Sequence, residues 1–130
     1  MATTTNTLAG ISGAAEVLLF GQPAFTVIHT ATATALDATA TPAAGQQARL
    51  FNLTLSYSAA PAVSVLTVED GSTVIWQAEI SATGRFVYFF DFSAKPLRGT
   101  KDAVLHVKVG SAGGAVVQTI SWVGDFIKAP

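Results

Sequence analysis

Apolar and polar residues alternate along much of the chain, which predicts β-strands. Between Phe51 and Tyr57, large apolar residues occupy every second position and small polar residues fill the positions between them. Because side chains in a strand have a period of two, this spacing places the apolar set in a core and the polar set outside. The stretch from Val104 to Val109 alternates in the same way, with His106 and Lys108 on the outward face.

Eight short runs rich in β-branched and aromatic residues are predicted as strands. They are Glu16 to Phe20, Phe25 to Ala35, Ala48 to Ser58, Ala62 to Val68, Thr73 to Ile80, Phe86 to Phe92, Val104 to Val109 and Val116 to Val123. Helical periodicity is absent, apart from one turn after Pro96. The predicted fold class is therefore all-β: a two-sheet antiparallel sandwich, jelly-roll-like, with about eight strands.

Turn residues separate these runs. Glu69 to Ser72 and Ser111 to Gly114 contain glycines that can adopt positive φ, and both are predicted as tight hairpins. The stretch from Asp37 to Gln47, with a Thr-Pro step and a glycine, is predicted as a longer loop. The run from Phe86 to Phe92 is apolar on both faces, which suits a central strand or a strand covered by a neighbouring subunit.

The first fifteen residues are small and polar and contain too little apolar mass to fold alone. We expect a flexible N-terminal arm over residues 1–15, ordered only by docking, and a single β-sandwich domain over residues 16–130. The arm lacks the basic and apolar regions of a secretory signal, and no run of apolar residues is long enough to span a bilayer. We therefore expect synthesis in an aqueous, cytosol-like compartment and no membrane partner.

Charge is scarce: 50% of the 130 residues are hydrophobic and only 12% are charged, against about 25% in an ordinary soluble domain. Two explanations remain open, a neutral exterior of small residues or an exterior largely hidden against partners, and we favour partners because interface cores are depleted in charge. Seven basic and eight acidic residues without any run of like charge do not predict nucleic-acid binding.

No pattern in the sequence predicts catalysis, a metal or a cofactor. The two histidines, His29 and His106, are interpreted as surface or interface imidazoles because no nucleophile motif accompanies them. The chain has no cysteine and its acidic residues are scattered, so no metal site is predicted. A carboxylate pair for glycoside hydrolysis stays open, with Glu69, Glu79 and Asp91 as candidates. We expect a protein that is not an enzyme.

The segment from Pro96 to Thr100 differs from the strand patterns. Its proline fixes the entry to a turn, Gly99 permits an unusual backbone angle, and Arg98 is expected to bond carbonyl groups or a carboxylate such as Asp91 or Asp102. The segment is interpreted either as a structural corner or as a contact between subunits through Arg98 and Thr100.

In the C-terminal half, the aromatic strand Phe89 to Phe92 leads into Pro-Leu-Arg-Gly-Thr, followed by the alternating strand Ala103 to Val109, a glycine-rich segment and the strand Val116 to Gly124. This arrangement resembles small β-sandwich virion proteins of tailed bacteriophages. The resemblance extends from Phe86 to Phe126. It implies a decoration or cement protein that binds the outer capsid surface, stabilises contacts between capsomers and has no catalytic residues.

The resemblance also implies a major capsid protein as partner, a location on the capsid surface of the virion after synthesis in the host cytoplasm, and a homo-oligomer, for which we favour a trimer over a dimer. Two alternatives stay open: another virion component (a tail, fibre or head-to-tail protein) and a lectin-like carbohydrate-binding module, which an exposed Trp76 or Tyr57 would favour. The expected interface residues are Arg98, Thr100 and, in the arm, Thr3, Thr4, Thr5, Leu8 and Ile11.

Overall fold

A computed structural model describes residues 24–81 and 85–130, which form nine β-strands and no helix. The predicted strand from Glu16 to Phe20 lies outside the described residues, and the other seven predicted runs each overlap an observed strand. The strands are β1 (Phe25–Thr32), β2 (Leu36–Ala40), β3 (Gln46–Tyr57), β4 (Ser64–Asp70), β5 (Thr73–Ile80), β6 (Val87–Asp91), β7 (Leu97–Arg98), β8 (Leu105–Val109) and β9 (Val117–Lys128).

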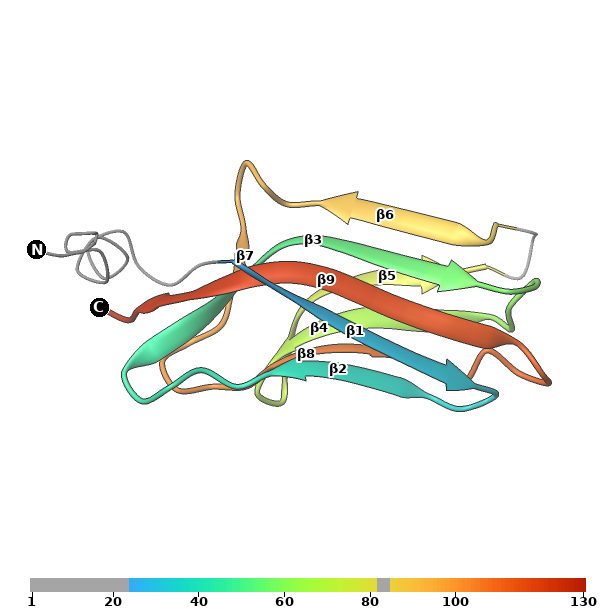
Figure 1. The fold of residues 1–130 in the computed structure, drawn as a ribbon, viewed down its shortest axis with the longest axis horizontal. Helices are drawn as coiled ribbons and strands as arrows, with labels where there is room; N and C mark the ends of the chain where they lie inside the picture. The colour runs from blue at the N-terminus through green and yellow to red at the C-terminus, as the bar shows by residue number, and fades with distance from the viewer. Residues whose placement is uncertain (1–23, 82–84) are drawn as a thin grey trace, which may run out of the picture.

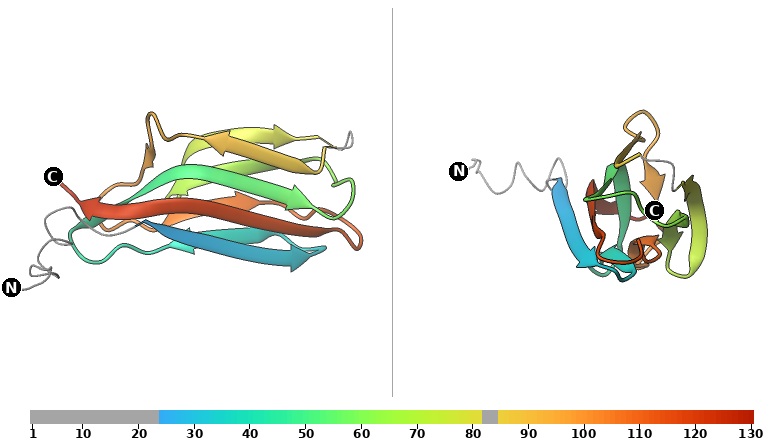
Figure 2. Two further views of the ribbon diagram at one scale, coloured as in Figure 1. Left: turned by 45° about the horizontal axis from the view of Figure 1, so that its top comes forward. Right: turned by 90° about the vertical axis from the view of Figure 1, so that its right-hand side faces the viewer.

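The strands form two antiparallel sheets packed face to face, which confirms the predicted all-β sandwich (Figure 1). One sheet has the order β1-β9-β3-β6, with the short β7 beside β3, and the other has the order β2-β8-β4-β5. Figure 2 shows the two layers from the end of the sandwich. The pairs β1–β9, β2–β8, β3–β6 and β4–β5 are nested along the chain, as in one long hairpin rolled upon itself, and this is the winding of a jelly roll.

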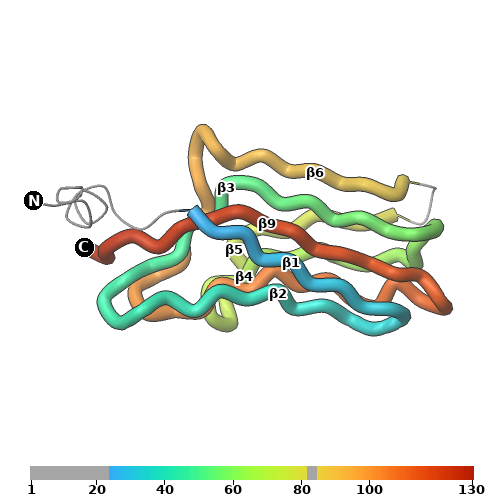
Figure 3. Tube along the Cα trace, in the orientation of Figure 1, coloured from blue at the N-terminus to red at the C-terminus, as the bar shows by residue number. Residues whose placement is uncertain are grey.

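The nested winding brings together segments that are far apart in the sequence. The first and last described strands, β1 and β9, run side by side, with Phe25 opposite Gly124 and Thr32 opposite Val117 (Figure 3). β9 lies between β1 and β3 and is therefore a central strand. The sheet cannot form without the last segment of the described chain.

The core lies between the two sheets and is built from alternate residues of the strands, as the sequence predicts for Leu53 and Leu55. The predicted inward position of Phe51 is wrong, because the register shifts between Leu50 and Asn52 and leaves Phe51 half-buried. The largest apolar side chains that are completely enclosed are Leu50, Leu53, Leu55, Leu66, Val68, Ile80, Leu105, Val107, Ile120 and Trp122.

Two of the predicted boundaries between strands and loops are wrong. The stretch predicted as a loop from residue 37 to 47 contains most of β2 and the start of β3, because Leu36, Ala38 and Ala40 alternate toward the core and β2 pairs with β8. The strand predicted from Phe25 to Ala35 ends at Thr32, and Ala33 turns the chain with φ of 57°.

Only one of the two predicted hairpins is confirmed. Gly71 has φ of 60° in the turn that joins β4 to its partner β5. Ser111 to Gly114 joins strands of different sheets, because β8 pairs with β2 and β4 whereas β9 pairs with β1 and β3, so this prediction is wrong. The chain after Pro96 forms the short strand β7 beside β3 and not the predicted turn.

The aromatic run from Phe86 to Phe92 forms β6, which lies at the edge of its sheet. The interpretation as a central strand is therefore wrong. Its outward-facing apolar side chains, Val87 and Phe89, are 57% and 61% exposed, so no strand of the described chain covers this face. Coverage by a neighbouring subunit, the other interpretation, stays a prediction.

Candidate interaction surface

The outer face of the sheet that contains β1 carries side chains that line up across four strands. The register places Ile28, Ser121, Thr54 and Phe89 in one row, and the next row runs from Thr30 to Val87. We call this surface the uncharged face. It consists of Thr26, Ile28, Thr30, Asn52, Thr54, Ser56, Val87, Phe89, Thr119, Ser121 and Val123. One charged side chain, the exposed Asp91, borders it at the edge of the sheet, opposite Asn52.

Large apolar side chains of the uncharged face are open to solvent. Ile28 is 64% exposed, and Val87 and Phe89 lie at the opposite edge of the face. The positions between them hold small hydroxyl and amide side chains, among which Thr30 and Thr119 bring their Oγ1 atoms within 3.0 Å. In its low charge and its exposed aromatic side chain, this surface agrees with the cores of protein interfaces, which are depleted in charged residues.

The outer face of the other sheet is charged. His106 Nδ1 lies 3.0 Å from Asp37 Oδ1, and Lys108 Nζ lies 3.1 Å from Glu69 Oε1. Apolar residues such as Val65 are also exposed there, but they stand among these charges. The two faces of the sandwich therefore differ in charge, and both expose large apolar side chains.

An ion pair marks one end of the uncharged face. Arg49 on β3 donates two hydrogen bonds to Asp125 on β9, with nitrogen-to-oxygen distances of 2.8 and 2.6 Å. These hydrogen bonds raise the pKa of Arg49 above its ordinary value. The guanidinium also lies over the ring of Phe51, 5.1 Å from its centroid. The pair joins the two central strands and limits the uncharged surface at this end.

Arg98 lies on β7, directly opposite Arg49 in the register, with an exposed side chain. Its two predicted partners are engaged elsewhere. The carboxylate of Asp102 accepts from Gly45 N–H at 2.7 Å, and that of Asp91 accepts from Ser93, which lowers the pKa of Asp91. Within residues 24–81 and 85–130, the guanidinium of Arg98 has no hydrogen bond or ion pair.

The contacts of Thr100 agree with the interpretation of residues 96–100 as a structural corner. The N–H and Oγ1 of Thr100 both donate to Asp70 Oδ1, at 3.0 and 3.3 Å, and tie the segment to the β4–β5 turn. The expected unusual backbone angle at Gly99 is wrong, since its φ is not positive. An added Cβ at this position would lie 3.2 Å from Asp70 Oδ1, a tight contact that a small shift of the carboxylate would have to relieve. The remaining predicted contacts lie outside the described residues: Thr3, Thr4, Thr5, Leu8 and Ile11.

The candidates for catalysis do not converge. His29 is exposed on β1, and in the part of the chain that the structure describes neither His29 nor His106 bonds a serine or threonine hydroxyl. Asp91 lies in a different sheet from Glu69 and Glu79. The described residues also contain no group of three or more histidine or acidic side chains that could hold a metal ion.

Neither aromatic residue that would favour a carbohydrate site is open to solvent. Tyr57 is 7% exposed. Trp76 is half-buried against Phe90 and Phe92, with ring centroids 4.8 and 5.2 Å apart. Core packing accounts for both residues.

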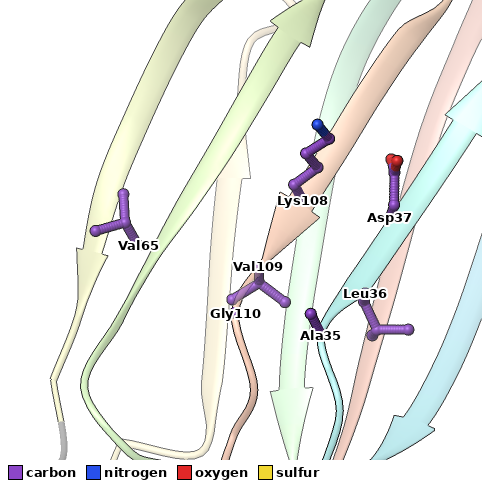
Figure 4. A pocket seen from close by; sticks show the side chains of 7 residues that line it. All are labelled: Ala35, Leu36, Asp37, Val65, Lys108, Val109 and Gly110. Atoms are coloured by element: carbon purple, nitrogen blue, oxygen red, sulfur yellow. The ribbon is translucent and has the colours of Figure 1, made fainter.

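A shallow hollow of about 370 Å³ lies where β2, β4 and β8 approach the end of the sandwich (Figure 4). Its polar side chains are already engaged, Asp37 with His106 and Lys108 with Glu69. Small-molecule sites need polar groups that remain free to orient a ligand, so the hollow does not indicate one. It is lined by Ala35, Leu36, Asp37, Val65, Lys108, Val109 and Gly110.

In the described part of the chain, no helix is both long and apolar enough to cross a membrane.

The chain matches no model of a known protein family and no curated protein. Solved structures with a similar fold include the insecticidal delta-endotoxin Cry8Ea1 from Bacillus thuringiensis, with 15% identity and a TM-score of 0.39 over 81% of this chain and 20% of the toxin. The extra small virus particle of the giant freshwater prawn Macrobrachium rosenbergii has 14% identity and a TM-score of 0.31 over 79% of both chains. A family two carbohydrate esterase from Cellvibrio japonicus has 14% identity and a TM-score of 0.28 over 82% of this chain and 36% of the esterase. These similarities identify neither a family nor a function.

Proposed function

We propose that this chain is a structural virion protein of a tailed bacteriophage, a decoration or cement protein that binds the outer capsid surface and stabilises contacts between capsomers. The observation that carries the proposal is the uncharged face, whose exposed Ile28, Val87 and Phe89 stand among neutral hydroxyl groups. The resemblance of the C-terminal half to phage virion proteins supports the same role. In this proposal the partner is the major capsid protein, and the chain reaches the capsid after synthesis in the host cytoplasm.

The uncharged face is small. Four strands about 4.8 Å apart, with rows that span about five residues at 3.4 Å each, present roughly 330 Å² in plan. An interface of that extent buries roughly 650 Å² over both partners, which is less than the ~1,000 Å² of a specific interface, so each copy contributes a weak contact. A copy that bridges two capsomers buries apolar surface against both of them. Separating the capsomers exposes that surface to water again, which costs about 25 cal/mol per Å² of apolar area. Repetition over a capsid lattice multiplies this modest gain.

The proposal is tested with virions of the phage that encodes the chain, produced without it and then mixed with the purified protein and pelleted. Ile28→Lys places a charge on the uncharged face, and Val65→Lys is the matched control on the charged face, also at an exposed position. We expect Ile28→Lys to lower the affinity for the particle about tenfold or more, because an ammonium must be desolvated in the contact, and Val65→Lys to leave it unchanged. Equal binding of the two variants, or no binding of the original protein, contradicts the proposal.

The N-terminal arm supplies a second test. The described chain enters the uncharged face at β1, one of its two edge strands. We expect deletion of residues 2–15 to abolish particle binding and to leave thermal unfolding unchanged, since these residues contribute little apolar mass to a core. Unchanged occupancy on the particle would exclude attachment through the arm.

Another virion position, in a tail, fibre or head-to-tail connection, would use the same surface. Electron microscopy of virions labelled with an antibody against the chain separates these positions. Antibody label distributed over the capsid supports the decoration role. Label confined to the tail or the portal vertex contradicts that role and supports a tail, fibre or head-to-tail protein.

A further inference from the structure

Among the strands of residues 24–81 and 85–130, none pairs with the outer edge of β6, which ends its sheet. Tyr57 N–H donates to Phe86 C=O at 2.8 Å, and Phe92 N–H donates to Phe51 C=O at 2.7 Å, at the two ends of the β3–β6 ladder. Antiparallel ladders alternate between hydrogen-bonded and non-hydrogen-bonded pairs. The even-numbered residues of this segment therefore direct their N–H and C=O groups toward β3.

The odd-numbered residues Val87, Phe89 and Asp91 consequently direct their N–H and C=O groups away from the sheet. Their side chains also point to the outer surface, where Val87 is 57% and Phe89 is 61% exposed. The strand thus presents outward main-chain groups at three positions, and at two of them, Val87 and Phe89, the exposed side chain is apolar. Figure 1 shows β6 at the edge of its sheet.

β6 has few of the features that usually protect an edge strand. Its residues include no proline and no lysine, and its ladder with β3 runs through five pairs without a bulge. Its one charged residue, Asp91, is the last residue of the strand, so Val87 to Phe90 are uncharged. Unprotected apolar edges are the sites at which chains add strands to one another.

We propose that β6 pairs with β6 of a second copy of this chain, antiparallel about a twofold axis through Phe89. The two Phe89 residues then face each other, and Val87 of each copy faces Asp91 of the other. Because all three residues direct their main-chain groups outward, this register pairs every free N–H and C=O of the strand. An apolar aromatic pair lies at its centre, a favourable cross-strand combination.

Charge is compatible with this arrangement. Each Asp91 lies opposite a valine, and the two carboxylates are about 14 Å apart, which is four residues along the strand and beyond the screening length of physiological salt.

The contact between the two strands is narrow, so dimerisation is expected at micromolar concentration. It selects the dimer over the trimer that we favoured from the sequence. It also joins two uncharged faces into one continuous surface of eight strands, β1-β9-β3-β6 from each copy.

The inference is tested on the full chain without any capsid, so its outcome is independent of the proposed decoration role. Sedimentation velocity across the micromolar range is expected to show a monomer of 13.4 kDa that converts reversibly to a dimer. A chain that stays monomeric, or a limiting mass of three copies, overturns the proposal. Amide exchange locates the contact: the amides of Val87, Phe89 and Asp91 should gain protection only in the dimer, and protection of these amides in the monomer would also overturn it.

The register is tested by charge complementation at the twofold axis. Phe89→Lys and Phe89→Glu each place two like charges opposite each other and are expected to weaken the dimer about tenfold or more, whereas a mixture of the two variants should recover it. Val87→Lys places an ammonium opposite Asp91 of the second copy and should preserve or strengthen the dimer. Ile28→Lys, on the far edge of the same face, is the matched control and should leave dimerisation unchanged.

All four substitutions are at exposed positions, so the fold should be retained, and circular dichroism verifies it. Equal effects of Phe89→Lys and Ile28→Lys, no recovery in the mixture, or a loss with Val87→Lys as large as with Phe89→Lys would each contradict the proposed register.

Discussion

Tyr57 carries a buried hydroxyl group that finds no hydrogen-bond partner in the described part of the chain. The residue is 7% exposed, and its ring meets that of Tyr88 edge-on, with centroids 6.4 Å apart. A buried polar group without a partner costs about 1–3 kcal/mol. Tyr57→Phe removes this group and keeps the ring, so we expect the free energy of unfolding at pH 7 to rise by about 1 kcal/mol.

The effect should grow in alkaline solution. Burial, with a smaller contribution from Tyr88, raises the pKa of Tyr57 to about 12, whereas the unfolded chain has the ordinary value of about 10. Below pH 10 both states hold the proton. Between pH 10 and 12 the unfolded state loses its proton first, so the stability of the original protein falls by about 1.4 kcal/mol per pH unit. The advantage of Tyr57→Phe is therefore expected to reach about 2.5 kcal/mol at pH 11.

Urea unfolding followed by tryptophan fluorescence at pH 7 and pH 11 measures both differences, and the comparison between variants cancels the titration of other groups. Tyr88→Phe is the control, because the Tyr88 hydroxyl donates to Ser81 C=O at 3.4 Å and its removal should not stabilise the fold. Destabilisation by Tyr57→Phe at pH 7, or a difference that does not increase at pH 11, would refute the unpartnered state of the hydroxyl.

Three further substitutions test the packing that supports the uncharged face. Gly124→Ala should lower the free energy of unfolding by at least about 3 kcal/mol. The added Cβ would collide with the carbonyl oxygen of Arg49 and lie 2.6 Å from the Trp122 ring. A loss below about 1 kcal/mol in urea unfolding would argue against this contact. Asp125→Asn removes the carboxylate charge from the partly buried ion pair and should cost about 2 kcal/mol, and an unchanged thermal midpoint would show that the pair contributes little. Trp122→Phe removes the hydrogen bond from Nε1 to Ala38 C=O and opens space in the core. Calorimetry should show that the free energy of unfolding falls by about 2–3 kcal/mol. A fall of less than about 1 kcal/mol would mean that neighbouring side chains fill the space.

The strands that the sequence predicts well are those in which large apolar residues alternate with polar ones. In β3 and β8, burial of Leu53, Leu55 and Val107 follows from the period of two alone. β2 has the same period, but two of its inward residues, Ala38 and Ala40, are small. Their burial depends on pairing with β8, which is distant in the sequence, and local patterns contain little information about such pairing.

Connections between strands were harder to predict than the strands. The two glycines of Ser111 to Gly114 indicate a turn correctly, since both have positive φ. Whether a turn closes a hairpin or crosses between sheets depends on which strands are neighbours, and the turn residues do not determine that. The same limit applies to β6, because an apolar strand at the edge and one at the centre have the same local sequence.

The uncharged face was predictable only in part. The low charge of the chain indicates a hidden surface, and the outward positions of Asn52, Thr54 and Ser56 follow from alternation. Their alignment with β1, β6 and β9 required the strand order. A threonine at position 100 could bond either another residue of this chain or a neighbouring subunit. The structure shows that Thr100 donates a hydrogen bond to Asp70 of its own chain.

The nested pairing of strands has a consequence for the order of folding. β4 and β5 are joined by a tight turn and can pair as soon as both are synthesised, whereas β1 must wait for β9, with Phe25 opposite Gly124. Loop closure of this length is costly, so we expect slow folding that proceeds from the middle of the chain outward. Pulsed amide exchange would detect early protection in β4 and β5, and early protection in β1 would contradict this order. Until β9 joins, β1 and β3 have no shared neighbour, so a growing chain cannot display the uncharged face and is shielded from premature assembly.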